Sequence, residues 1–184
     1  MGWRVRTFAS AQEFLERVPT DAPCCIVLDL QMPGLTGLDL QKRMAEMGLE
    51  TPIIFLTGHG DIPVTVEAMK AGASEFLTKP VDDDKLRAAI EEAIERDRLA
   101  REQRADRDAL QHLYDSLTAR EQEVMQHVIA GLLNKQIAAD LGSSEVTIKI
   151  HRGQIMRKMK AQSVVELAHM GEKIGITSIR DIPY

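Results

Sequence analysis

Three polar side chains follow three apolar segments in the first half of the chain: Asp29, Thr57 and Lys79. The runs before Asp29 and Thr57 lack the alternation of a half-exposed strand, which predicts strands buried on both faces of a parallel sheet. The carboxyl ends of parallel strands meet at one sheet edge, where ligands bind. A carboxylate, a hydroxyl and an ammonium there suit phosphoryl chemistry, with Asp29 as acceptor and the other two stabilising phosphoryl oxygens. The alternative is that Asp29 only opens a surface turn.

Composition places the chain among ordinary globular proteins, with 44% hydrophobic and 28% charged residues. No apolar run approaches the ~20 residues of a membrane helix, and the first residues do not form a signal-peptide pattern. Cys24 and Cys25 are adjacent in an apolar segment, which indicates small core residues in a reducing compartment and neither a redox pair nor a metal site. We therefore expect a cytoplasmic protein without a membrane partner.

Charge divides unevenly along the chain. Residues 1–117 hold 14 Lys and Arg against 21 Asp and Glu, whereas residues 118–184 hold 9 against 7. This asymmetry favours two domains, the second of which meets an anion.

Strands and helices alternate in the first part. The patterns predict strands over 3–8, 24–29, 53–56 and 75–78, and helices over 10–18, 38–47, 63–71 and from 83 onward. Helix starts are indicated by the Ser10–Glu13 capping box, by Pro63 and by Asp82. The alternation predicts an α/β fold with a parallel sheet.

The last of these helices has no obvious end. Leu86, Ile90 and Ile94 give it an apolar stripe, but residues 95–108 are almost entirely charged residues and alanine. Opposite charges three and four residues apart favour a solvated helix, so we expect a helical linker. A coiled-coil dimer contact is the alternative.

After Leu117 the pattern becomes wholly helical. Predicted helices cover 119–130, 134–141, 145–160 and 163–170, with N-caps at Thr118, Asn134 and Ser144 and a stop at Gly171. Their apolar residues, Val146 and Ile150 among them, are expected to form one small core. The Gly142-Ser143-Ser144 connection is typical of a helix-turn-helix.

Short motifs surround the three polar residues of the first part. They are Met32-Pro33-Gly34 and Gly37 after Asp29, Gly58-His59-Gly60-Asp61 after Thr57, Ala68-Met69-Lys70-Ala71-Gly72-Ala73, and Pro80 after Lys79. The set spans about residues 3–94 and closely resembles the receiver domain of bacterial two-component response regulators. The resemblance implies a flavodoxin-like fold in which a sensor histidine kinase phosphorylates Asp29.

The same resemblance implies roles for two further residues. Gln31 would offer its backbone carbonyl to Mg²⁺, and Phe76 would rotate as Thr57 moves toward the phosphoryl group. Simple core packing is the alternative for Phe76, and a solvent-facing loop position is expected for His59.

The sequence departs from the receiver pattern at its start. Receivers begin with a strand that ends in an acidic pair and then a helix, whereas this sequence begins at what resembles the second strand, and no acid precedes Glu13. Asp29 with one carbonyl is a poor Mg²⁺ site. We therefore expect a receiver truncated at its N-terminus, by biology or by a gene model, that does not bind Mg²⁺ competently. The 3–8 and Asp29 strands should then pair across the gap or contact a second chain.

Residues of the second part resemble a LuxR-type helix-turn-helix. The matching segments are 131–138 and 146–151, within about residues 117–167, and with the receiver they resemble the NarL/FixJ class of transcriptional regulators. Lys135, at the start of its helix, suits a DNA phosphate. The residues expected to enter the major groove are Thr147, Lys149, Ile150, His151, Arg152 and Lys158. For each cation the alternative is a solvated helix face, and Ile150 either belongs to the core or touches a thymine methyl.

The sequence therefore predicts a truncated receiver (1–95), a helical linker (96–116) and an all-α LuxR-type domain (117–184). The expected function is DNA-binding transcription regulation in a two-component system, without enzyme activity. A homodimer on promoter DNA and RNA polymerase are the expected partners. The alternative is a phosphorylation-independent docking or dimerisation scaffold; an autoinducer-binding regulator is disfavoured by the Asp29, Thr57 and Lys79 set.

Overall fold

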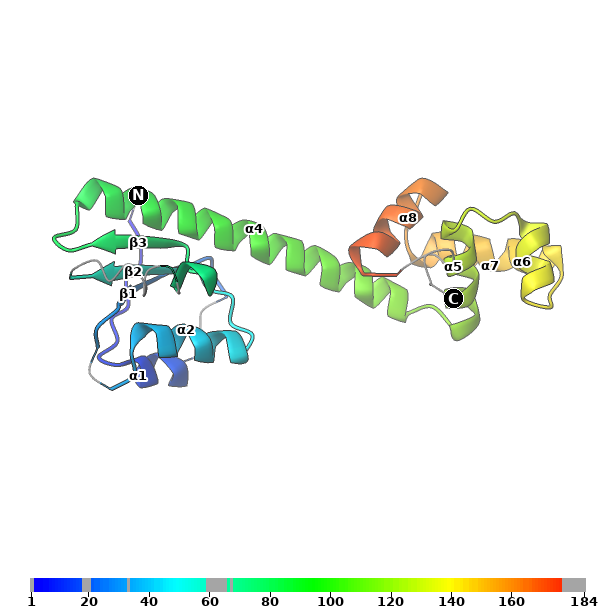
Figure 1. Cartoon of the computed structure of the whole chain (residues 1–184). Coiled ribbons are helices and arrows are strands. Elements are labelled where there is room, and N and C mark those ends of the chain that lie inside the picture. Colours follow the sequence, from blue (N-terminus) through cyan, green and yellow to red (C-terminus); the bar gives the residue numbers. More distant parts are fainter. Residues whose placement is uncertain (1, 18–20, 33, 59–65, 67, 177–184) are drawn as a thin grey trace. The chain divides into compact units, whose positions relative to one another are not determined.

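The computed structural model describes residues 2–17, 21–32, 34–58, 66 and 68–176 (Figure 1). The chain divides into two compact units, Met1–Glu102 and Gln103–Tyr184.

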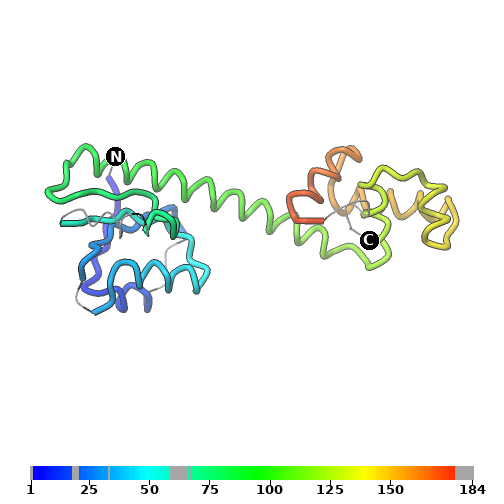
Figure 2. Tube along the Cα trace, in the orientation of Figure 1, coloured from blue at the N-terminus to red at the C-terminus, as the bar shows by residue number. Residues whose placement is uncertain are grey.

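The first unit is built on a parallel sheet. Its described strands are β1 (Ile26–Asp29), β2 (Ile53–Thr57) and β3 (Glu75–Thr78), in the order β1-β2-β3. Helices α1 (Ala11–Glu16) and α2 (Gly37–Glu46) lie on one face, and the beginning of α4 (Asp83–Asp115) covers the other (Figures 1 and 2). The predicted α/β fold with a parallel sheet is confirmed.

Local capping explains where these helices begin. The Ser10 side chain accepts a hydrogen bond from the Glu13 N–H, and Asp82 Oδ1 accepts from the first amides of α4, as the sequence predicts. Thr36 and Asp39 form a reciprocal capping box at the start of α2. Pro33, His59 and the predicted helix start at Pro63 lie outside the described residues.

The predicted strand over residues 3–8 is wrong. These residues pair with no described strand, and Trp3 and Val5 are 43% and 78% exposed. An alternating pattern forms a strand only where a sheet edge lies alongside it, and tertiary context overrides the pattern here. The expected pairing of this segment with the Asp29 strand is therefore also absent from the described part of the chain.

β1 differs from the prediction of a strand buried on both faces. β2, at the centre, buries Ile53, Ile54 and Phe55, whereas Val27 of β1 is 41% exposed because β1 stands at the edge of the described sheet. Cys24 and Cys25 precede the strand as half-buried free thiols, and burial raises the pKa of Cys25 to about 11.

Two polar contacts tie helices to this unit. Gln41 of α2 donates from Nε2 to the carbonyls of Ala68 (3.2 Å) and Ala71 (3.0 Å). On the other face, the buried Asp97 of α4 accepts from the Cys24 N–H at 2.9 Å and from Arg101 at 2.7 Å. The bond from Cys24 ties α4 to the segment that enters β1, and Arg101, one turn along α4, neutralises the buried carboxylate.

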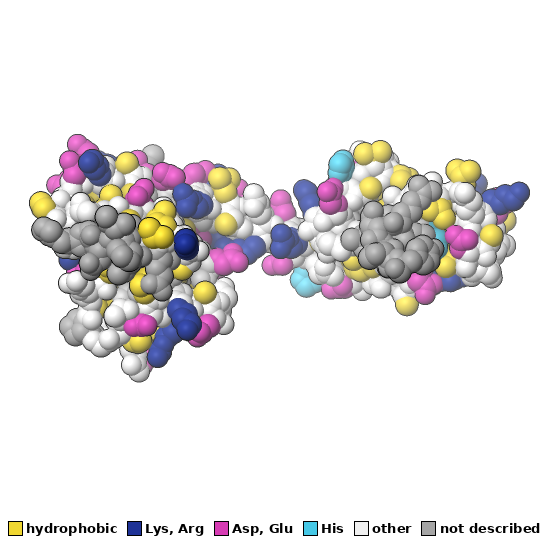
Figure 3. Space-filling view, in the orientation of Figure 1, with side chains coloured by type: hydrophobic (Ala, Val, Ile, Leu, Met, Phe, Trp, Pro, Cys, Tyr) yellow, Lys and Arg dark blue, Asp and Glu magenta, His cyan; other side chains and the backbone are white. Residues whose placement is uncertain are grey.

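The predicted long helix is confirmed as α4, although its Asp97, within the stretch expected to be solvated, is buried. It runs without interruption for 33 residues, and the boundary between the two units falls inside it. Ion pairs one turn apart join Arg96 to Glu92 and Arg98 to Glu95 and Glu102. Figure 3 shows acidic and basic side chains interspersed along it, as expected for a helix surface that faces water. No helix among the described residues is long and apolar enough to cross a membrane.

The second unit is a cluster of short helices, α5 (Ala119–Ile129), α6 (Asn134–Asp140), α7 (Glu145–Lys158) and α8 (Val164–Lys173). Its fully buried side chains include Val124, Met125, Ile137, Ile148, Ile155, Met159 and Leu167. The predicted capping box of Thr118 and Glu121 at α5 is confirmed.

Two predicted helix ends in this unit are wrong. Leu133 and not Asn134 is the N-cap of α6, because the Gln136 side chain accepts from the Leu133 N–H at 2.8 Å. Gly171 does not end α8: it is buried beside Met125 and Ile129 side chains, and α8 continues to Lys173.

Candidate phosphoacceptor site and DNA interface

The ends of the three strands bring the predicted phosphoryl residues to one sheet edge. Asp29 closes β1, Thr57 closes β2, and Lys79 follows β3 directly. In the parallel register Thr57 stands opposite Thr78, and the Lys79 N–H donates to the Thr57 carbonyl at 2.6 Å. Asp29 and Lys79 thus meet across the end of the middle strand.

Asp29 is held as a carboxylate. Lys79 Nζ lies 2.5 Å from Asp29 Oδ2, and the Gln31 N–H donates to Oδ1 at 3.1 Å. The Lys79 hydrogen bond is the largest influence, and with the Gln31 amide it outweighs burial, so the pKa of Asp29 lies below its usual value. An ionised oxygen nucleophile beside an ammonium is the arrangement that phosphoryl acceptance requires.

Thr57 and Phe76 lie deeper than Asp29. Thr57 is 1% exposed. The Phe76 ring is partly buried against the core, 6.1 Å from the Phe55 ring and tilted by 39°. In this conformation Phe76 therefore packs in the core, which was the alternative to a switch role.

The described residues do not fit a complete Mg²⁺ site. No group of three His, Cys, Asp or Glu among them is placed to hold a metal. Asp29 already pairs with Lys79, and the exposed Gln31 offers only a carbonyl. Mg²⁺ prefers octahedral oxygen ligation and is usually held by one or two carboxylates plus water. Among the described residues at this sheet edge, the oxygen ligands for such an ion are the Asp29 carboxylate, already paired with Lys79, and the Gln31 carbonyl.

In the second unit, α6, residues 141–144 and α7 form a helix-turn-helix. Gly142 adopts φ 59°, and the Ser143 N–H donates to the Ala138 carbonyl at 2.9 Å. Ser144 caps α7 by accepting from the Thr147 N–H at 3.1 Å, and the two hydroxyls lie 2.9 Å apart. The turn and cap orient the first turns of α7 outward from a rigid base.

One face of α7 is exposed along its whole length. This exposed stripe consists of Val146, Lys149, Ile150, Gly153 and Arg157, spaced by three and four residues. Placing Val146 and Ile150 in the core was wrong, since they are 70% and 56% exposed while Ile148 and Ile155 fill the core.

Four of the predicted DNA-contacting residues lie at the surface. Lys135 is exposed at the second position of α6, and Thr147, Lys149 and Ile150 are exposed in the first turns of α7. Neither Lys135 nor Lys149 forms an ion pair or side-chain hydrogen bond with any described residue. Their charges are therefore available to a partner.

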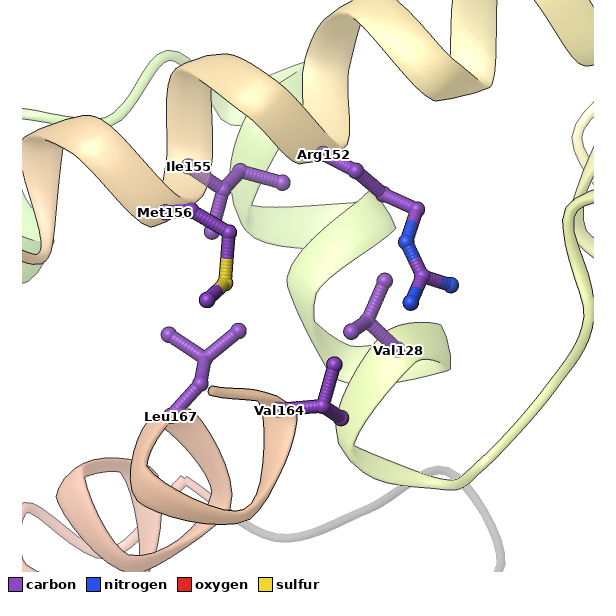
Figure 4. Close-up of a pocket in the computed structure, with 6 residues that line it drawn as sticks. All are labelled: Val128, Arg152, Ile155, Met156, Val164 and Leu167. Atoms are coloured by element: carbon purple, nitrogen blue, oxygen red, sulfur yellow. The ribbon is translucent and has the colours of Figure 1, made fainter. Parts of the chain in front are cut away.

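His151 and Arg152 lie off the exposed stripe. His151 is half-buried, and its Nδ1 has no hydrogen-bond partner among the residues placed in the structure. The Arg152 side chain extends toward Val128 and Val164 at a small hollow of about 80 Å³ (Figure 4). This hollow, also lined by Ile155, Met156 and Leu167, lies among α5, α7 and α8. Arg152 therefore borders the helical core.

Lys158 is engaged inside its own unit. Its Nζ lies 2.6 Å from Glu121 Oε2 and donates to the Ser116 carbonyl at 3.3 Å. Glu121 is 3% exposed and also accepts from the Thr118 N–H at 2.7 Å. Burial raises the pKa of Glu121, but the bonds from Lys158 and Thr118 outweigh it and the pKa lies below its usual value. The structure thus shows a partner for Lys158 inside its own unit, and its predicted contact with DNA stays a prediction.

Sequence reasoning missed the partnership between Glu121 and Lys158. The capping box of Thr118 and Glu121 was visible, but nothing local connects Glu121 to a lysine 37 residues away.

The two units together indicate the class of protein. The first is an α/β unit with an ionised aspartate beside a lysine at the sheet edge, which suits a phosphoacceptor. The second is a helix-turn-helix with an exposed face that carries cations, which suits DNA binding. The class is therefore a DNA-binding regulator with a candidate phosphoacceptor site.

Comparisons with known proteins agree with this class. Residues 1–91 match the family "Response regulator receiver domain", and residues 115–171 match "Bacterial regulatory proteins, luxR family". Nodulation protein W of Bradyrhizobium diazoefficiens is 48% identical over 97% of this chain and 78% of its own length. Transcriptional regulatory protein FixJ of the same organism is 43% identical over 95% of this chain and 85% of its own length.

Solved structures give the same result. The response regulator StyR matches with a TM-score of 0.82 at 47% identity over 93% of this chain and 86% of its own. Full-length FixJ from B. japonicum matches with a TM-score of 0.50 at 43% identity, over 92% of this chain and 83% of its own. The chain therefore belongs to the two-component response regulators that join a receiver to a LuxR-type helix-turn-helix, and it is a DNA-binding regulator.

Proposed function

We propose that, in the intact form of the protein, phosphorylation of Asp29 by a sensor histidine kinase controls how the helix-turn-helix binds promoter DNA. The observation that carries this proposal is the Asp29–Lys79 pair at the carboxyl edge of the sheet. It unites an ionised acceptor with the cation that a transferred phosphoryl group needs.

The transfer itself is a displacement at phosphorus. An Asp29 oxygen forms the new P–O bond while the phosphorus–nitrogen bond of a phosphohistidine breaks, and the imidazole leaves with the electron pair. Lys79 then neutralises a phosphoryl oxygen in place of the carboxylate, and the Thr57 hydroxyl donates a hydrogen bond to another. Phe76 rotates as Thr57 moves toward the phosphoryl group.

The DNA contacts divide by chemistry. Lys135 and the first amides of α6 bind a phosphate, since helix N-termini favour anions. Thr147, Lys149 and Ile150 face base edges from the beginning of α7. Among the predicted contacts, His151 and Arg152 have less exposed positions, and Lys158 pairs with Glu121 in the free chain.

We divide the chain into a receiver (1–95), a helical linker (96–116) and the DNA-binding domain (117–184). The protein acts by binding and not by catalysis, in the cytoplasm, as a homodimer on DNA that contacts RNA polymerase. These assignments rest on its family membership and on the exposed stripe of α7, which carries Lys149 and Arg157.

A second candidate is phosphorylation-independent docking or dimerisation through the receiver. It is favoured by one observation: the described residues hold no cluster of three potential metal ligands. A receiver without a bound divalent ion must bring two anionic groups together with only the Lys79 ammonium to neutralise them.

A mobility-shift experiment separates the two. DNA enriched from a random duplex pool is titrated with the parent chain and with Asp29→Asn, each with and without acetyl phosphate and Mg²⁺; Asp106→Asn, an exposed acid of α4, is the control. A shift that depends on acetyl phosphate and on Asp29 supports the controlled regulator. Equal binding in every arm, by a chain whose intact mass shows that Asp29 has gained the phosphoryl group, supports the scaffold.

A further inference from the structure

The first turns of α7 contain residues that are poor helix formers. Val146, Thr147, Ile148 and Ile150 are β-branched and lose side-chain freedom in a helix. Burial explains Ile148, and the hydroxyl pairing with Ser144 explains Thr147. Val146 and Ile150 remain, 70% and 56% exposed. The stability of the domain does not account for these two residues.

Val146 and Ile150 lie one turn apart on the exposed stripe, on either side of Lys149. One turn further stands Gly153, where an added Cβ would meet nothing within 4 Å. The stripe thus combines apolar surface, a cation without a partner among the described residues, and a bare backbone. Such a surface suits close approach by an anionic partner that carries apolar groups. In the DNA major groove the apolar group is the C5-methyl of thymine.

We propose that Val146, together with Ile150, reads the C5-methyl group of thymine in the major groove. This inference rests on the proposed placement of α7 on DNA. β-branched side chains are held near one χ1 rotamer in a helix, so they lose little freedom when they contact a methyl group. Gly153 lets the next turn of α7 approach the groove wall.

The test removes the methyl group from the DNA. The full 184-residue chain first enriches its binding site from a random duplex pool, and the site is then remade with deoxyuridine replacing one thymine at a time. Affinities are measured by fluorescence anisotropy at one fixed salt concentration. Loss of the contacted methyl should weaken binding about fourfold, the worth of one buried carbon. In Val146→Ala the same replacement should weaken binding much less than it does in the parent chain, because only Ile150 then remains beside the methyl group.

Val165→Ala is a matched control. Val165 is the second residue of α8 behind the Ser163 cap, as Val146 is the second residue of α7 behind Ser144, and it is 68% exposed. Val165→Ala should keep the full dependence on the methyl group. Circular dichroism melts confirm that both variants remain folded.

Each other outcome overturns a defined statement. If no thymine shows methyl dependence, or if Val146→Ala keeps it in full, the inference is wrong although DNA binding stands. If only Ile150→Ala abolishes it, the assignment to Val146 is wrong. If the chain enriches no sequence, the proposed DNA-binding function fails and this inference fails with it.

Discussion

Replacing Lys158 by methionine tests whether this lysine serves the fold or the DNA. The change keeps the length of the side chain and removes its charge, leaving the 3% exposed carboxylate of Glu121 with the Thr118 N–H. Breaking a fully buried ion pair costs roughly 3–5 kcal/mol. Lys158 is 31% exposed, so we expect a loss of about 2–3 kcal/mol.

Amide hydrogen exchange of α7 reports on this unit alone. A loss of this size lowers the protection of its slowest amides roughly 30- to 150-fold, at 1.36 kcal/mol per factor of ten. Lys149→Met is the control, because Lys149 is exposed and has no ion-pair partner among the described residues. Adding Glu121→Gln to Lys158→Met should restore part of the protection, since it removes the isolated buried charge.

The pH dependence has a definite sign. The folded pKa of Glu121 lies below its usual value, so its stabilisation is present above about pH 4.3 and is lost as the pH falls through the folded pKa. The difference between parent and Lys158→Met should therefore shrink below pH 4.3. Two results together would refute this reasoning: amide protection in Lys158→Met equal to that of the parent, and a salt slope of DNA binding reduced by about one. Lys158 would then be assigned to a DNA phosphate.

Three further predictions concern the two sites. Lys149→Ala should weaken specific DNA binding by about 1–3 kcal/mol more than binding to random DNA, whereas Lys135→Ala should weaken both equally and reduce the salt slope by about one; parent-like salt titrations would contradict both placements. Gly153→Ala should stabilise α7 by roughly 0.5–1 kcal/mol in a thermal melt yet lower DNA affinity, and higher affinity would show that no surface approaches that turn. The 184-residue polypeptide should gain no phosphoryl group from acetyl phosphate and Mg²⁺ by intact mass; a stoichiometric gain absent from Asp29→Asn would show that Asp29 works without further carboxylates.

Local signals in the sequence determined most of the elements. The strands at 53 and 75, the caps Ser10, Asp82 and Thr118, and the long helix from Asp83 were all predictable, because capping and hydrophobic periodicity depend on residues a few positions apart. Asp29 and Lys79 were also predictable as neighbours, since parallel strands end at a common edge.

Tertiary structure decided which strand patterns form strands and which apolar residues face the core. Residues 3–8 have a strand pattern but no neighbouring strand among the described residues, and β1 leaves Val27 exposed because it stands at an edge. In α7, the segment Val146-Thr147-Ile148-Lys149-Ile150 alternates apolar and polar residues, which does not match the period of a helix and does not show which isoleucine faces inward. Packing against α5 and α6 selects Ile148.

The same holds for charge. Lys149 and Lys158 are both lysines of the same helix and both were predicted to contact DNA, yet Lys149 is exposed whereas Lys158 pairs with Glu121. That pairing joins residues 37 positions apart. Its formation depends on how α5 and α7 pack, and no local pattern encodes that distance.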